Sequence, residues 1–347
     1  CNLLAPKTTR NGSTKIMIKT VPQDIAVLGA GSWGTAVALA LAHQGHRVHL
    51  WARDTSFLSQ HENSKYLPGI PFPSNLKITH KLSETLKSPN LLIAVPSHAF
   101  MDLISQIPKL PKRGIAWITK GIEPITFRLF SVLLQEKYGQ DLPMALISGP
   151  SFAKEVAAQK PTALVVAGNT TEIRQHWQTL LHSDINRVYT SEDLIGVQIC
   201  GAVKNVLAIA CGISDGLNYG ANSRAALITR GLAEMTQLGL AMGAQRETFS
   251  GLAGLGDLVL TCTDNQSRNR RFGLYLGQGL DVAAAAKEVK QVVEGLHNAK
   301  QVTSLAQYYQ IEMPIAEAVH AVLSNKLDAA QAAKSLLQRP IKTQDKP

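Results

Sequence analysis

Three residues in this sequence could together move a proton to or from an alcohol oxygen. Lys120 stands in the motif WITKG directly after an apolar run, and Lys204 stands in GAVKN within a much longer apolar segment. Burial lowers the pKa of a lysine toward neutrality, which suits a group that protonates a developing alkoxide. The alternative is a lysine whose stem lies on apolar surface while its tip is exposed. Asp257, at the end of GLAGLGD, could orient Lys204 or a substrate hydroxyl, or could cap the helix that follows it.

A glycine-rich turn near the start of the chain predicts a dinucleotide site. The motif GAGSWG places Gly29, Gly31 and Gly34 between an apolar run at 25–28 and an alanine-rich helix expected at 35–43. In such a turn the first glycine allows the tight bend, the second lets a pyrophosphate approach the backbone, and the third lets the helix pack on the strand. Glycine turns also serve purely structural ends, but here a strand precedes the turn, a helix follows it, and a second strand comes next.

The end of the second strand indicates which dinucleotide binds. An NAD site usually has an acidic residue about 20 residues beyond the glycines, where it bonds the ribose hydroxyls. Here Trp51 and Ala52 occupy that position, and Arg53 could pair with a 2′-phosphate. The sequence therefore favours NADP, or NADPH in its reduced form. If Arg53 is instead a solvated loop residue and Asp54 bonds the ribose, the cofactor is NAD or either of the two.

Three further segments carry candidate ligand contacts. The motif SRNRR begins an expected helix, where arginines oppose the helix dipole; a phosphate held by Arg268 and Asn269, or salt bridges to acidic residues, would compensate. In SGPSFA a strand-to-helix turn makes Ser151 a plausible N-cap and leaves free N–H groups for a ligand. His98 follows the end of another strand and is expected to line the site rather than to react.

These residues need an α/β domain followed by a helical one. Short apolar runs joined by helices predict strands buried on both faces and therefore a parallel, doubly wound, Rossmann-like sheet. After Thr190 the strand runs stop and helical periodicity takes over, beginning with a helix that has one apolar, core-facing stripe. The expected strands are 25–28, 47–50, 91–95, 115–118, 145–147 and 162–167, and the expected helices of the second domain are 192–213, 222–242, 267–277, 294–310, 314–324 and 328–338. We expect a basic tail (1–22), a dinucleotide-binding domain (23–189), an all-helical substrate and catalytic domain (190–338) and a flexible tail (339–347).

Composition and charge exclude several other classes of protein. The chain has 347 residues and a net charge of +10, but residues 1–22 hold four basic and no acidic residues, and residues 339–347 hold three basic and one acidic. No nucleic-acid-binding motif accompanies these basic ends. The apolar runs are shorter than the roughly 20 residues that cross a bilayer, and the N-terminal residues lack the apolar core of a secretory signal. The four cysteines lack metal-site spacing, so we expect a soluble, cytoplasmic protein without a bound metal.

Taken together, the motifs resemble those of bacterial-type NAD(P)-dependent glycerol-3-phosphate dehydrogenases over residues 24–335. In chain order they are GAGSWGTA, LWARD, YLPG, VPSHAF, TKGIE, SGPSFAKE, GAVKNV, GLAGLGDLVLTC, SRNRRFG and VVEG. The resemblance implies the reversible, NAD(P)H-dependent reduction of dihydroxyacetone phosphate to sn-glycerol 3-phosphate, which feeds glycerophospholipid synthesis. It also implies a homodimer.

The resemblance further implies a role for residues in each motif. Lys204 would be the catalytic acid and base, with Lys120 and Asp257 as its partners. The cofactor would be contacted by Gly29, Gly31, Ser32, Trp33, Gly34, Arg53, Tyr66, Lys120, Ala153, Arg268, Val292 and Glu294. The substrate would be contacted by Lys120, Gly149, Ser151, Lys204, Asn205, Asp257, Ser267, Arg268 and Asn269. Arg53 departs from the family pattern, because some relatives have histidine there, and the preference for a 2′-phosphate is inferred from that arginine.

Two other functions fit part of this pattern. A hydroxy-acid or ketopantoate-type reductase of the same two-domain architecture would need the glycine turn and a helix lysine but no phosphate site. An NADP(H)-binding sensor or interaction protein would need the glycine turn and Arg53 but not the pair of Lys204 and Asp257. The phosphate site and the lysine–aspartate pair therefore distinguish the three functions.

Overall fold

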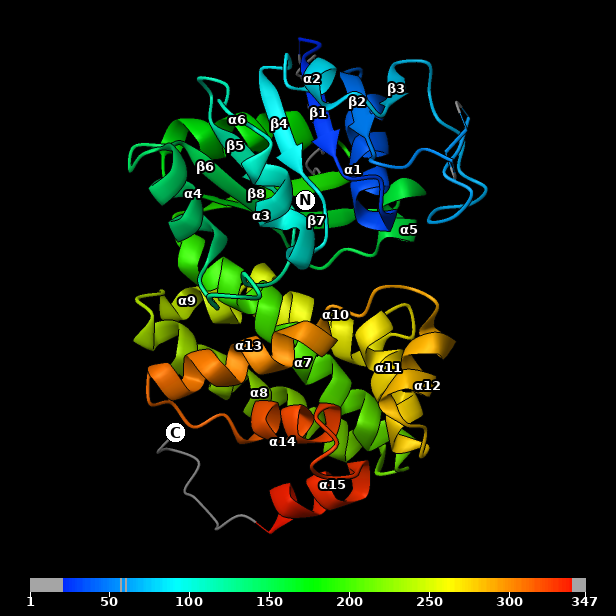
Figure 1. The fold of residues 1–347 in the computed structure, drawn as a ribbon, viewed down its shortest axis with the longest axis vertical. Coiled ribbons are helices and arrows are strands. Elements are labelled where there is room, and N and C mark those ends of the chain that lie inside the picture. Colours follow the sequence, from blue (N-terminus) through cyan, green and yellow to red (C-terminus); the bar gives the residue numbers. More distant parts are fainter. Residues whose placement is uncertain (1–20, 57, 60, 339–347) are drawn as a thin grey trace, which may run out of the picture.

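The computed structural model describes residues 21–56, 58–59 and 61–338, and these form two domains (Figure 1). The α/β domain contains the N-terminal half, and the helical domain below it in the figure contains α7 to α15. The prediction of a Rossmann-like domain followed by an all-helical domain is confirmed. The last strand ends at Ser191 and α7 begins at Leu194, so the change from α/β to helical structure falls between them. The predicted tails (1–22 and 339–347) lie outside the described residues, apart from residues 21 and 22.

One eight-stranded sheet forms the centre of the first domain, in the order β3-β2-β1-β4-β5-β6-β7-β8. The strands are β1 (Asp24–Leu28), β2 (Arg47–Trp51), β3 (Leu76–Thr79), β4 (Asn90–Ile93), β5 (Ile115–Trp117), β6 (Met144–Ser148), β7 (Thr162–Gly168) and β8 (Asn186–Ser191). The order of the first six is that of dinucleotide-binding sheets, whose ligands lie where the order reverses, between β1 and β4. The expectation of a wholly parallel sheet is wrong at one place, because β6 and β7 pair antiparallel. β3 and β8 were not predicted.

Helices cover both faces of this sheet, which explains its continuous apolar strands. They are α1 (Ser32–His43), α2 (Leu82–Thr85), α3 (Ser97–Ser105), α4 (Phe130–Tyr138), α5 (Ala153–Ala157) and α6 (Thr171–Leu181). The core on one face includes α1, α5 and α6, and the core on the other includes α3 and α4. There Phe100 stacks on Phe130 with ring centroids 4.1 Å apart. The carboxyl ends of β1 and β4 face the helical domain (Figure 1), and those of β5 and β6 do so too because these strands run parallel to β4.

The helical domain is built around α7, which the other helices surround (Figure 1). Its elements are α7 (Leu194–Gly216), α8 (Gly220–Ala241), α9 (Arg246–Ser250), η1 (Leu252–Gly256), α10 (Asp257–Thr263), α11 (Arg268–Gly277), α12 (Val282–Val289), α13 (Gly295–Tyr308), α14 (Pro314–Leu323) and α15 (Ala329–Leu337). The core-facing stripe predicted on this helix is confirmed at Ile199, Val203, Val206 and Ile213, and burial extends beyond it around almost the whole circumference of α7. Of the helices in the described residues, α7 alone is long and apolar enough to cross a membrane, and it is packed inside this domain.

The six helices predicted in this domain are present, with ends within three residues of the expected ones. α9, η1, α10 and α12 were not predicted, and α1 begins at Ser32 rather than at residue 35.

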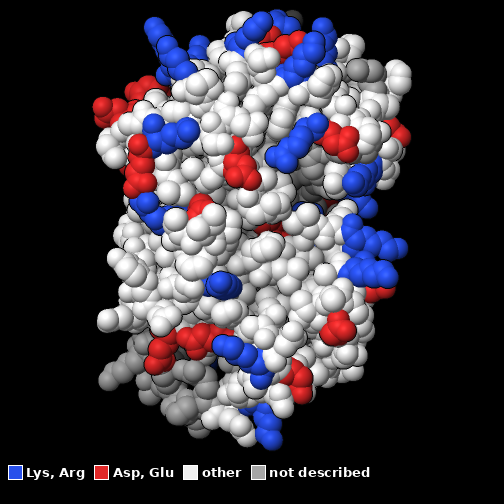
Figure 2. Space-filling model, viewed as in Figure 1, with Lys and Arg blue, Asp and Glu red and all other residues white. Residues whose placement is uncertain are grey.

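The surface carries charges of both signs. Figure 2 shows basic and acidic side chains mixed over the face in view, without a region of one sign that extends across a domain.

Candidate active site

The two predicted lysines meet on one buried aspartate at the boundary between the domains. Lys120 follows β5, Lys204 lies on α7, and Asp257 is the first residue of α10. Lys204 Nζ donates to Asp257 Oδ1 at 2.5 Å and to Thr261 Oγ1 at 3.1 Å, and Lys120 Nζ donates to Asp257 Oδ2 at 2.7 Å. Lys204 is 6% exposed and Asp257 1%, so the alternative of an exposed lysine tip does not hold. One carboxylate therefore connects the two domains.

Burial and charge act in opposite directions on this cluster. Burial lowers the pKa of Lys204 to about 7; the charge of Asp257 opposes this shift and the charge of Lys120 adds to it. Burial by itself raises the pKa of Asp257, but the two ammonium groups outweigh burial and the pKa falls below its ordinary value. Asp257 is thus ionised at neutral pH, where Lys204 can either give or take a proton.

The glycine-rich segment before Asp257 determines where that aspartate lies. Residues Leu252–Gly256 form one π-helical turn, a rare conformation that often occurs at functional sites. A Cβ at Gly254 would overlap the backbone of Phe249, so the close approach requires glycine. The N-cap of α10 is Gly256. The alternative role for Asp257, as a helix cap, is therefore not the one that its side chain has.

The glycine turn after β1 has room where a pyrophosphate would lie. Gly29 has a φ of +130°, and a Cβ there would meet the Ala94 backbone at 2.7 Å. A Cβ at Gly34 would overlap the carbonyl of Gly29. At Gly31, the N-cap of α1, a Cβ would have no atom within 4 Å, so there is open space beside the N-terminus of the helix. The Trp33 Nε1 is buried and has no hydrogen-bond acceptor among the described residues.

Asn63, which the sequence analysis did not single out, holds this turn in place. Its side chain is fully buried, and Nδ2 donates to the Ala30 carbonyl and to Thr35 Oγ1, each at 2.9 Å. Its Oδ1 accepts from the Tyr66 N–H at 3.0 Å, and Ser32 Oγ donates to the Tyr66 carbonyl at 3.0 Å. The segment between β2 and β3 is thereby fixed to the glycine turn. In the sequence, the only sign of this role is that Asn63 stands shortly before the YLPG motif.

The arginines at the start of α11 differ in their partners. Arg270 donates to Asp215 at 2.5 Å and also to Asn265. Arg268 is half-buried, and it forms no side-chain hydrogen bond or ion pair with any part of the chain that the structure describes. Burial lowers its pKa; the charge of Glu294 opposes this shift and the charge of Arg271 adds to it. Ser267 caps the helix by accepting from the Arg270 N–H. Salt bridging therefore accounts for Arg270 but not for Arg268.

Buried amides tie the helices of the site together. Asn269 Nδ2 donates to Asn205 Oδ1, and Asn205 Nδ2 donates to Asn298 Oδ1, both at 2.9 Å. Asn269 Oδ1 accepts from the Gly295 N–H at 2.9 Å. Two predicted substrate residues, Asn205 and Asn269, thus bond each other and fix α7, α11 and α13 relative to one another.

The turn after β6 differs from its prediction. Gly149 has a φ of +122°, and a Cβ there would meet the Ala163 carbonyl oxygen at 3.0 Å. Ser151 Oγ donates to the Gly149 carbonyl at 3.0 Å, and the N-cap of α5 is Phe152, with no side-chain cap. The prediction of Ser151 as an N-cap is therefore wrong, because the helix begins one residue later, at Ala153.

The residues after β2 lie at the surface. Arg53 and Asp54 are both exposed. Asp54 Oδ1 accepts from the Ser56 N–H at 2.8 Å, and this hydrogen bond lowers the pKa of Asp54. The carboxylate thus belongs to a local turn, whereas the guanidinium of Arg53 is at the end of the strand.

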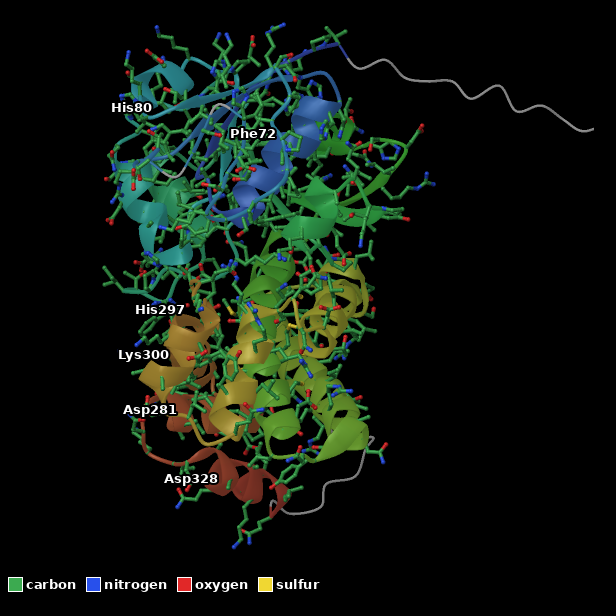
Figure 3. The ribbon with its side chains drawn as sticks, turned by 90° about the vertical axis from the view of Figure 1, so that its right-hand side faces the viewer. Phe72, His80, Asp281, His297, Lys300 and Asp328 are labelled. Carbon is green, nitrogen blue, oxygen red and sulfur yellow. The ribbon has the colours of Figure 1, made fainter. Side chains whose placement is uncertain are left out.

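Glu294 reaches across the domain boundary from the start of α13. Its Oε2 accepts from Ser97 Oγ at 2.6 Å, and its Oε1 accepts from the Ser97 N–H at 3.4 Å. Figure 3 shows His297 at the end of α13 that faces the α/β domain, and its ring centroid is 6.0 Å from that of exposed His98. Val292 is 43% exposed. The structure therefore brings Glu294 and His98 to the same boundary as the lysines.

A Rossmann-like sheet whose glycine turn has room for a pyrophosphate, together with a buried lysine whose pKa is about 7, is typical of nicotinamide-dependent dehydrogenases and reductases. Two family profiles narrow this class. The profile described as NAD-dependent glycerol-3-phosphate dehydrogenase N-terminus matches residues 24–174, and the profile of the C-terminus matches residues 193–334. The chain belongs to the NAD-dependent glycerol-3-phosphate dehydrogenase family.

Individual relatives agree with this assignment. The chain is 57% identical over 323 residues to a protein of Legionella pneumophila (strain Lens) named glycerol-3-phosphate dehydrogenase (NAD(P)+), covering 92% of this chain and 98% of the relative. The crystal structure of glycerol-3-phosphate dehydrogenase from Coxiella burnetii matches with a TM-score of 0.88 at 50% identity, and the match covers 92% of this chain and 99% of the Coxiella chain. A ketopantoate reductase from Ralstonia eutropha JMP134 matches with a TM-score of 0.55 at 15% identity, covering 90% and 99%. The latter shares the fold alone, and the resemblance seen in the motifs is confirmed.

Proposed function

We propose that this protein reduces dihydroxyacetone phosphate to sn-glycerol 3-phosphate with a reduced nicotinamide cofactor, and that it also catalyses the reverse reaction. The observation that carries the proposal is the buried pair of Lys204 and Asp257 at the boundary to which the unpaired Arg268 also belongs. The lysine–aspartate pair is suited to proton transfer, and Arg268 is suited to binding a phosphate. The names of close relatives support the same reaction.

Lys204 supplies the proton in this proposal. As the carbonyl oxygen at C2 gains negative charge, the protonated amine donates to it, and in the reverse direction the neutral amine removes the proton. Two of the three Nζ hydrogens bond Asp257 and Thr261, which leaves one for the substrate oxygen. Lys120, on the other oxygen of Asp257, keeps that carboxylate ionised and adds positive charge near the developing alkoxide.

The glycine turn would hold the cofactor. The open space at Gly31 and the first N–H groups of α1 suit the pyrophosphate, and Trp33 Nε1 is a buried donor in need of an acceptor. Ser32 and Tyr66 would border the same space. The predicted contacts from Lys120, Ala153, Arg268, Val292 and Glu294 would complete the site. When bound, the reduced nicotinamide supplies the hydride.

Arg268 would hold the substrate phosphate. A guanidinium matches two phosphate oxygens at once, and the Arg268 side chain forms no hydrogen bond or ion pair with the described residues, although the charge of Glu294 acts on it. Gly149, Ser151, Asn205, Ser267 and Asn269 would complete the substrate contacts. Binding at the phosphate, which does not itself react, orients the nearby carbonyl and so contributes to the rate as well as to affinity.

A direct assay tests the proposed reaction. The protein is mixed with NADPH or NADH and with dihydroxyacetone phosphate, unphosphorylated dihydroxyacetone or ketopantoate, and the absorbance of the reduced nicotinamide is followed. We expect rapid loss with the phosphate ester and slow loss with the other two. Preferred reduction of ketopantoate would establish the rival reductase, and tight cofactor binding without turnover would establish the sensor.

The rate of reduction is expected to fall as the pH rises through about 7. Because burial lowers the pKa of Lys204 to about 7, the amine is protonated below this pH and neutral above it. Reduction needs the protonated amine and oxidation needs the neutral one, so kcat/KM should fall above pH 7 in reduction and rise in oxidation. In Asp257→Asn the charge that favours the ammonium ion is lost, and both profiles should move to lower pH by roughly one unit. Profiles between pH 5 and 9 that do not move would assign the titration to another group.

Arg53 is expected to select NADPH by pairing with its 2′-phosphate. In Arg53→Ala the KM for NADPH should rise by about tenfold or more while the KM for NADH stays within about twofold, because only NADPH carries the lost partner. Asp54→Asn is the matched variant at the next residue, and it should leave both values nearly unchanged, since Asp54 bonds Ser56. A rise in the NADH value in Asp54→Asn would instead assign the ribose contact to Asp54.

We also propose a cytoplasmic homodimer whose product enters glycerophospholipid synthesis. The family resemblance supports these three statements. Sedimentation of the purified protein tests the homodimer, and a monomer at working concentration would exclude it.

A further inference from the structure

Arg268 and Glu294 lie on either side of a single hydrogen bond. Asn269, the residue after Arg268, accepts from the N–H of Gly295, the residue after Glu294, at 2.9 Å. This bond to the Asn269 side chain brings the start of α11 close to the start of α13, where the two charged residues lie. Burial lowers the pKa of half-buried Arg268 and the charge of half-buried Glu294 opposes this shift, so the two groups are within electrostatic range, yet no hydrogen bond or ion pair joins them.

The observed partner of Glu294 is instead Ser97, in the other domain. Ser97 is 1% exposed and is the first residue of α3. Its hydroxyl donates to Glu294 Oε2 at 2.6 Å and its N–H approaches Oε1 at 3.4 Å, so the carboxylate also lies at the positive end of the helix dipole. A Cβ at Gly121, next to Lys120, would meet the Ser97 Cβ at 3.0 Å, so the serine is closely packed at the boundary.

We propose that Ser97 is a positioning residue that holds Glu294 on the α/β domain and thereby keeps Arg268 unpaired for a phosphate dianion. This inference rests on the proposed function, because it takes Arg268 as the phosphate ligand. Without the serine hydroxyl, Glu294 is free to turn to Arg268. The substrate phosphate must then compete with a carboxylate for the same guanidinium.

A double-mutant cycle tests the inference. At saturating cofactor, Ser97→Ala is expected to raise the KM for dihydroxyacetone phosphate by about tenfold with little change in kcat, because an ion pair must be broken before the phosphate binds. In a Glu294→Gln background the same serine change should alter this KM by less than about twofold, since no competing charge remains. Ser105→Ala, at the other end of α3, is the matched control, because its exposed hydroxyl bonds only the Asp102 carbonyl.

The outcomes separate this inference from the proposed function. An equal effect of Ser97→Ala in both backgrounds would mean that the serine acts through packing alone, and no effect in either would also overturn the inference. Ser97→Cys, which keeps the shape but donates weakly, should lie between serine and alanine and replaces alanine where the latter does not fold. If Arg268→Ala itself leaves the KM for dihydroxyacetone phosphate unchanged, the phosphate assignment fails rather than the role of Ser97.

Discussion

Lys204→Met is expected to lower kcat for ketone reduction by about 10³-fold, because a positioned general acid contributes roughly 10²- to 10⁴-fold. Methionine has a similar length and no charge, so it can fill the buried position beside Asp257 without leaving an unpaired cation. Asp257 keeps its hydrogen bond to Lys120 at 2.7 Å, which limits the structural damage. The KM for dihydroxyacetone phosphate should change much less than kcat. Steady-state kinetics at saturating cofactor, with thermal unfolding to check the fold, measure both.

Lys120→Met is the matched comparison, because Lys120 bonds the other oxygen of the same carboxylate. Its side chain is 16% exposed against 7% for Lys204, and it comes from the α/β domain. We expect a loss of about tenfold in kcat, as for a charge that supports the proton donor without being the donor. A larger loss in Lys120→Met than in Lys204→Met would show that Lys120, and not Lys204, is the proton donor.

The motif-bearing parts of the fold and site could be predicted because their signals are local. Gly29 and Gly34 have neighbours that exclude any side chain, and a turn with that requirement is visible in a short stretch of sequence. Lys204 was recognisable because a charged residue interrupts an apolar helix. The same local approach missed β3 and β8. Both are edge strands with partly exposed residues, so neither has the continuous apolar run of the central strands.

The parts that were missed depend on contacts between distant residues. The residues of β7 do not indicate that this strand runs antiparallel to β6, because the direction of a strand depends on the path of the segment that connects it to the strand before. Asn63 and Ser97 are ordinary polar residues in sequence, and their roles appear only when Asn63 meets Ala30 and Ser97 meets Glu294, 197 residues away. The sequence indicates which residues can react, whereas the residues that position them are recognised only from their contacts in the structure.

Arg268→Ala is expected to lower kcat/KM for dihydroxyacetone phosphate by about 10²- to 10³-fold. Removing one partner of a buried, charge-assisted contact costs about 2–5 kcal/mol, and each 1.4 kcal/mol corresponds to a factor of ten. Most of the loss should appear in KM, and part in kcat, because a bound phosphate that takes no part in the reaction also orients the carbonyl. Steady-state kinetics at saturating cofactor measure the effect. Arg268→Lys keeps the charge but not the two-oxygen contact, and should fall between the wild type and alanine.

Unphosphorylated dihydroxyacetone provides the decisive control for this prediction. It has the same carbonyl but lacks the group that Arg268 would bind, so wild type and Arg268→Ala should reduce it with kcat/KM values that agree within a few-fold. Such agreement, together with a large difference for the phosphate ester, would locate the role of Arg268 at the phosphate rather than in the fold. Equal losses with both ketones would show that the arginine acts on the cofactor or on the catalytic lysine, and the phosphate would then need another partner at the boundary between the domains.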